Sequence, residues 1–207
     1  MYRKVQKRVI SVTIGRPREF DIEQALDVAM QLFWRKGYEG TSLSDLTGAL
    51  GITRPSLYAA FGNKETLFRS VLDRYEARAG AYRPRALQAP VAREVARQLL
   101  ESAAKLHGDR NNPAGCLGVQ GALACGEDAD PVRRELIAHR RAGEAAIRQR
   151  LKRAKAKGDL PANADPAGLA NYLSAVLYGM AVLSAGGASR RDLLQVAEIA
   201  LRAWPDA

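Results

Sequence analysis

Hydrogen-bond donors cluster around one short segment near the start of the chain. They are hydroxyl, guanidinium, phenol and ammonium groups, carried by Thr53, Arg54, Ser56, Tyr58 and Lys64. Such groups donate to phosphate oxygens and to base edges, and an arginine can bind guanine through two parallel hydrogen bonds. Each residue alone is equally typical of a polar surface or a helix cap. Their order and spacing together favour contact with DNA.

Two short helices must position these donors. Ser42 is a suitable N-cap for a helix that carries Leu46 on its apolar side. Thr53 is a suitable N-cap for a second helix, in which Leu57 can pack inward. Gly51 lies between them, where the chain must reverse its direction. This arrangement predicts a helix-turn-helix, which offers its second helix to the major groove of DNA.

Cap and turn signals divide the rest of the chain into further helices. Asp21 precedes a helix that ends at Gly37, and Asn63 precedes one that runs toward Gly80. No stretch shows the sustained apolar and polar alternation of a strand. The fold is therefore predicted to be all-α, with an N-terminal three-helix head and a C-terminal helical body. After a connection over residues 82–90, body helices are expected over residues 91–107, 130–158, 166–185 and 189–204, with a short apolar stretch at 116–125.

Three motifs of the head resemble the tetracycline-repressor (TetR) family of DNA-binding regulators. They are GRPREFD at residues 15–21, FWRKGYEGTS at 33–42 and GITRPSLYAAFGNKE at 51–65. The resemblance covers roughly residues 15–75. It implies a transcriptional repressor that leaves a palindromic operator in double-stranded DNA when an unknown small molecule binds the body. The residues that it implies at the DNA are Thr41, Ser42, Thr53, Arg54, Ser56, Tyr58 and Lys64.

The chain is expected to divide into three parts. Residues 1–14 form a basic tail, residues 15–80 the DNA-binding head, and residues 81–207 the ligand-binding and dimerisation body. Arg16 and Arg18 precede the first helix as a basic arm, which either enters the minor groove or remains a solvated tail.

Charge and composition limit the possible partners. The formal net charge is +10, which favours a polyanionic partner without distinguishing nucleic acid from a membrane surface. Residues 167–189 hold no charged residue, but polar residues and a Gly186-Gly187 break argue against a membrane span. The basic start of the chain does not resemble a signal peptide. We expect a protein of the bacterial cytoplasm, associated with the nucleoid.

A single recognition helix covers few base pairs, so a twofold dimer is expected to double the readout. The helices over residues 166–185 and 189–204 are predicted to pair with their mates as a four-helix bundle. The residues expected to be buried between the subunits are Leu169, Leu173, Val176, Leu177, Leu193 and Leu201.

The body also carries one candidate sensing residue. Cys116 follows Gly115 at the start of a short apolar stretch, and some TetR-like regulators use a body cysteine to sense oxidants or electrophiles. The competing interpretation is a small buried residue. The second cysteine, Cys125, is too far along a continuous helix to form a disulfide with Cys116.

Other classes of function remain as alternatives. One is a redox-active or enzymatic protein centred on Cys116, and another is a protein that coats DNA without sequence preference. A zinc site formed by His107, Cys116, Cys125 and His139 lacks the close ligand pairs of structural zinc. We therefore predict no enzyme activity, no catalytic residue, no metal and no cofactor.

Overall fold

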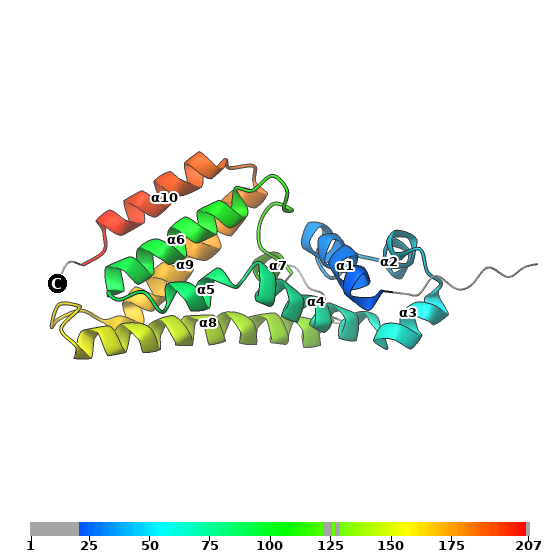
Figure 1. The fold of residues 1–207 in the computed structure, drawn as a ribbon, viewed down its shortest axis with the longest axis horizontal. Helices are drawn as coiled ribbons and strands as arrows, with labels where there is room; N and C mark the ends of the chain where they lie inside the picture. The colour runs from blue at the N-terminus through cyan, green and yellow to red at the C-terminus, as the bar shows by residue number, and fades with distance from the viewer. Residues whose placement is uncertain (1–20, 122–125, 127–128, 206–207) are drawn as a thin grey trace, which may run out of the picture.

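The computed structural model describes residues 21–121, 126 and 129–205, and every regular element in these ranges is a helix. The predicted all-α class is confirmed. Figure 1 shows two parts along the long axis of the molecule, a small head and a longer helical body. Arg16, Arg18, the predicted tail over residues 1–14 and Cys125 lie outside the described residues.

The head consists of four helices whose starts match the predicted caps. The Asp21 carboxylate accepts hydrogen bonds from two backbone N–H groups of the first turn, and Asn63 accepts one from Thr66 N at 2.8 Å. Ser42 forms a reciprocal capping box with Asp45. Gly51 adopts φ 66°, a left-handed conformation that suits glycine at a helix end. The helices are α1 (Ile22–Lys36), α2 (Leu43–Leu50), α3 (Arg54–Phe61) and α4 (Lys64–Arg78).

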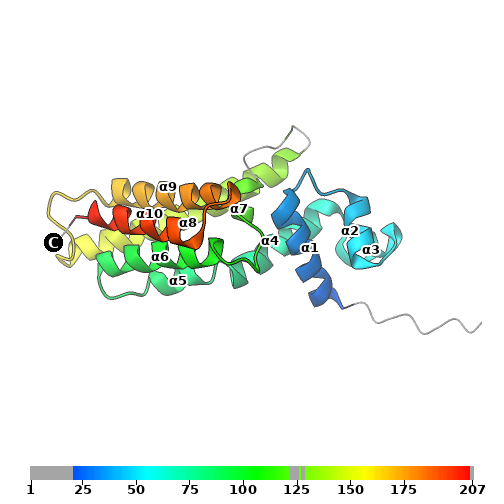
Figure 2. The ribbon, with the colours of Figure 1, turned by 90° about the horizontal axis from the view of Figure 1, so that it is seen from above.

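The body is a bundle of helices that run roughly along the long axis of the molecule, as Figure 2 shows from above. Helix α9 packs against α6, α8 and α10. Asp165 and Ser189 cap α9 and α10 as predicted. The body helices are α5 (Tyr82–Ala86), α6 (Ala92–His107), α7 (Leu117–Gln120), α8 (Asp130–Ala156), α9 (Pro166–Ala185) and α10 (Arg190–Arg202).

The structure corrects two local predictions. The connection over residues 82–90 contains the one-turn helix α5. Pro84 does not prevent this helix, because it falls within the first turn, where a backbone N–H group has no partner within the helix. Asp130 is the first residue of α8 and does not cap it; the preceding Ala129 occupies the cap position. The Asp130 carboxylate instead pairs with Arg133 and Arg134 one turn further on.

Helix α9 is long and apolar enough to cross a membrane by length and composition alone. In the structure, Leu173, Met180 and Ala181 of this helix are buried among the other body helices. These contacts explain the apolar residues on the buried side of α9, whereas Val182 and Leu183 of the same helix are exposed.

The hydrophobic core of the head continues into the body. Phe33, Phe68 and Leu72 from α1 and α4 belong to the same cluster as Leu117 of α7 and Leu136 of α8. Helix α7 therefore lies between the two parts, and its position is fixed by both.

Candidate nucleic-acid interface and body cavity

Helix α3 presents a polar face to solvent and an apolar face to the head. Leu57 and Phe61 are buried in the head core. Tyr58 is 45% exposed, although it is one of the larger aromatic side chains of the head. The predicted contact residues on this helix that lie on the exposed side are Thr53, Arg54, Ser56 and Tyr58.

Hydrogen bonds fix several of these side chains. Thr53 Oγ1 and Ser56 Oγ lie 2.9 Å apart at the start of α3. Arg54 Nη2 donates to Ser44 Oγ of α2 at 3.1 Å, which holds the guanidinium across the two short helices. Ser44 was not among the predicted residues, because its role depends on how α2 lies beside α3.

Lys64 lies beside an aromatic ring that the sequence reading did not single out. Its Nζ is 4.3 Å from the ring centroid of Tyr38, a cation–π distance. Partial burial lowers the pKa of Lys64, and the carboxylates of Glu39 and Asp45 oppose that shift. The ammonium group is thus held in place at the start of α4, where backbone N–H groups also favour an anion.

One predicted DNA contact is wrong. Thr41 is completely buried, and its hydroxyl donates to the Gly37 carbonyl at 2.7 Å, so it stabilises the turn after α1. Its neighbour Ser42 is exposed and stays a candidate, although its hydroxyl also bonds to Asp45 in the capping box.

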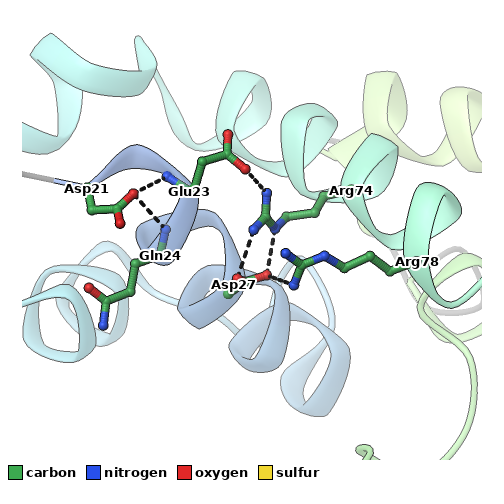
Figure 3. Close-up of polar contacts among 6 residues, drawn as sticks. All are labelled: Asp21, Glu23, Gln24, Asp27, Arg74 and Arg78. Carbon is green, nitrogen blue, oxygen red and sulfur yellow. Dashed lines mark hydrogen bonds and ion pairs between the residues drawn. The ribbon is translucent and has the colours of Figure 1, made fainter.

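An ion-pair network holds α1 against α4 (Figure 3). Arg74 binds Asp27 through two hydrogen bonds of 2.5 and 2.8 Å and also pairs with Glu23. Arg78 donates to the same Asp27 carboxylate. The hydrogen bond from Arg74 is the main cause of a lowered pKa at Asp27; burial opposes the shift and Arg78 adds to it. This network fixes the helix that carries Lys64 relative to the rest of the head.

The body contains a cavity of about 420 Å³ next to the head. Cys116 lines it and is buried, and the Tyr75 hydroxyl of α4 donates to Cys116 Sγ at 3.2 Å. Burial is the main cause that raises the pKa of Tyr75, and the neighbouring Cys116 adds to the shift. The phenol therefore stays protonated and remains a donor. The predicted sensing residue thus touches both a cavity and the helix that leads into the head.

Two pairs of polar side chains in the cavity wall bond to one another. Arg83 Nη1 donates to both carboxylate oxygens of Glu76, at 2.8 and 3.0 Å. Tyr178 donates to Glu144 Oε1 at 3.2 Å. The remaining wall is largely apolar and includes Leu87, Leu99, Val119, Ile147, Leu177 and Ala181.

A backbone group at Gly115 joins the head to the body. Its carbonyl oxygen accepts a hydrogen bond from Trp34 Nε1 of α1 at 3.1 Å and lies 3.0 Å from His107 Nδ1 of α6. Its N–H group donates to Ser184 Oγ of α9 at 3.1 Å. None of these long-range contacts can be read from local sequence spacing.

The predicted dimer residues divide into two groups. Leu173 and Leu193 are 0% exposed in the single subunit and Leu177 is 8% exposed, so they have little or no surface to offer a partner. That part of the prediction is wrong, because these residues form the subunit's own core. Leu169, Val176 and Leu201 are half-buried and stay predicted interface residues. Large exposed apolar residues on α9 and α10, which the sequence reading missed, are Val182, Leu183 and Ile199.

Among the residues that the structure describes, no group of three histidine, cysteine or carboxylate side chains could hold a metal ion. Cys125, one of the four residues considered for a zinc site, lies outside the described residues.

A helix-turn-helix head joined to an all-helical body defines the class of helical DNA-binding regulators. Residues 25–71 match the family of bacterial regulatory proteins, tetR family, and residues 92–196 match the tetracyclin repressor-like C-terminal domain. The chain therefore belongs to the TetR family.

Curated relatives and solved structures agree with this assignment. The chain is 37% identical to the HTH-type transcriptional repressor ComR of Escherichia coli K12, over 93% of this chain and 92% of that protein. It is 32% identical to the repressor BdcR of the same strain, over 97% and 95%. It also matches a structure of a cysteine mutant of the TetR family transcriptional regulator CifR complexed with 26 bp operator DNA, with a TM-score of 0.87, 44% identity and coverage of 92% and 100%.

Proposed function

We propose that the protein is a transcriptional repressor that binds a palindromic operator through α3 of each subunit of a homodimer. The observation that carries this proposal is the two-sided character of α3. Leu57 and Phe61 anchor the helix in the head core, and the opposite side exposes the donor groups of Arg54, Ser56 and Tyr58. Such a helix can enter a major groove without unfolding any part of the head.

The same arrangement supports a dimer. One eight-residue helix reaches only a few base pairs, and a twofold pair reads two half-sites about one turn of DNA apart. The exposed side chains of Val182, Leu183 and Ile199 on α9 and α10 supply apolar surface for a partner subunit.

Two routes of release from DNA are proposed, and both act at the body cavity. A small molecule in the cavity weakens operator binding if it favours a body conformation in which the distance between the two heads of the dimer no longer matches the operator. Modification of Cys116 has the same effect, because its sulfur touches Tyr75 on the helix that continues from the head.

DNA binding is tested by fluorescence anisotropy with a labelled duplex from the region upstream of the gene and a scrambled duplex of equal length. Lys64→Ala is expected to weaken binding to both duplexes. It should also lower, by about one, the magnitude of the slope of the logarithm of the binding constant against the logarithm of the salt concentration. Arg54→Ala is expected to cost about 1–3 kcal/mol on the upstream duplex and little on the scrambled one. Lys152→Ala removes an exposed cation of α8, far along the chain from the head, and serves as the matched control.

Footprinting separates a repressor from a protein that coats DNA. Protection of one discrete palindrome supports the proposal. Uniform protection along the duplex, or equal affinity for the two sequences, would contradict it.

A further inference from the structure

His107 occupies a position between the cavity and the head. It is the last residue of α6, it is buried, and its ring lines the cavity. Its Nδ1 lies 3.0 Å from the Gly115 carbonyl oxygen. Because a carbonyl oxygen can only accept, Nδ1 must carry the hydrogen in this contact.

The charge of the ring then fixes the state of its other nitrogen. Burial lowers the pKa of His107 to about 4; the contact with Gly115 opposes the shift, and the positive charge of Arg83 adds to it. At neutral pH the ring therefore carries one proton, on Nδ1, and Nε2 is a lone-pair acceptor. Within the described residues no hydrogen bond reaches Nε2.

Several other polar groups of the wall already form hydrogen bonds within the protein. Arg83 is paired with Glu76, and Glu144 accepts from Tyr178. Arg140 donates to the Gly118 carbonyl at 3.0 Å.

We infer that the cavity takes a mainly apolar molecule that carries one hydroxyl or N–H group, and that His107 Nε2 accepts the hydrogen bond from this group. The inference rests on the proposed function in one respect, namely that this cavity is the effector site. It adds the chemical class of the effector and the residue that recognises its polar group.

The position of His107 also connects recognition to the head. A donor at Nε2 polarises the ring and strengthens its Nδ1–H bond to Gly115, since hydrogen bonds in a chain reinforce one another. The same Gly115 carbonyl accepts from Trp34 of the head. Occupancy of the cavity therefore changes the strength of a contact that the head shares.

The test compares para-propylphenol with its methyl ether, which has the same skeleton but no donor. Binding to the full-length protein is measured by isothermal titration calorimetry at neutral pH. We expect the phenol to bind roughly five- to tenfold more tightly than the ether, which corresponds to the net contribution of one neutral hydrogen bond to the binding free energy.

Two variants separate recognition from folding. In His107→Asn the amide group replaces Nδ1–H toward Gly115 but leaves no acceptor at the position of Nε2, so the variant should stay folded and lose the preference for the phenol. His107→Phe removes both functions, and its thermal midpoint reports the structural part. Equal binding of phenol and ether to the unaltered protein, a preference that survives in His107→Asn, or no binding of either probe would each overturn the inference. The operator-binding variants of Arg54 and Lys64 decide the proposed function separately from these outcomes.

Discussion

Trp34 Nε1 donates to the carbonyl oxygen of Gly115 at 3.1 Å, although 81 positions separate the two residues in the chain. The indole ring belongs to α1 of the head and packs edge-on against Tyr75 of α4, with 4.8 Å between the ring centroids. Tyr75 in turn donates to Cys116, the residue next to Gly115. Two adjacent residues before α7 thus bind two aromatic side chains of the head.

The contribution of this contact can be measured with Trp34→Phe. The phenyl ring keeps most of the packing against Tyr75 but loses the donor to Gly115. Trp204→Phe is the matched control, because Trp204 is equally buried and its Nε1 has no hydrogen-bond partner within the described residues. We expect Trp34→Phe to lower the free energy of unfolding by about 1 kcal/mol more than Trp204→Phe does. Urea denaturation of both variants checks this, and equal losses would contradict it.

The burial of Cys116 makes a prediction about its reactivity. Its side chain is 2% exposed, so a reagent must reach it through the cavity. In a Cys125→Ser background, N-ethylmaleimide is expected to modify Cys116 in the folded protein far more slowly than in urea, as followed by intact mass. Once modified, the protein should lose affinity for its operator duplex.

Two controls accompany this experiment. Cys116→Ser should bind the duplex normally and should not respond to the reagent. Rapid modification in the folded state would contradict the buried position, and unchanged DNA binding after complete modification would argue against a sensing role.

Local signals in the sequence predicted much of the head. The caps at Asp21, Ser42, Thr53 and Asn63 act within three residues of their own positions, so each helix start could be predicted from neighbouring residues alone. Thr41 shows the limit of this reading: it has the residue type of a phosphate ligand, but tertiary packing buries it.

Contacts between distant segments could not be predicted from neighbouring residues alone. The bonds of Gly115 to Trp34 and Ser184 join residues whose proximity depends on the complete bundle. The interface prediction failed at Leu173 and Leu193 for a related reason, because an apolar helix face does not reveal whether it covers its own subunit or a partner.

The network around Asp27 predicts a pH dependence of stability. Hydrogen bonds from Arg74, opposed by burial and assisted by Arg78, place the folded pKa of Asp27 below its ordinary value of 3.8. The stabilisation is therefore fully present above that value and is lost as the pH falls from there through the folded pKa. Asp27→Asn should lower the free energy of unfolding at pH 7, with a smaller effect near pH 3. Asp73→Asn, an exposed carboxylate on α4, serves as the control in urea titrations at both pH values, and an equal effect of Asp27→Asn at the two pH values would contradict the assignment.

The exposed apolar residues of α9 and α10 predict where the subunits meet. Ile199 is 64% exposed and Val182 is 50% exposed, and a charge placed in a buried apolar interface cannot be hydrated. Ile199→Glu is therefore expected to shift the protein from dimer to monomer in sedimentation velocity and to weaken operator binding, because the two heads are no longer linked. Val91→Glu introduces the same charge at an apolar residue that is 44% exposed just before α6, and it should leave the dimer intact. If Ile199→Glu sediments as a dimer and Val91→Glu does not, the subunits meet through a different face of the body.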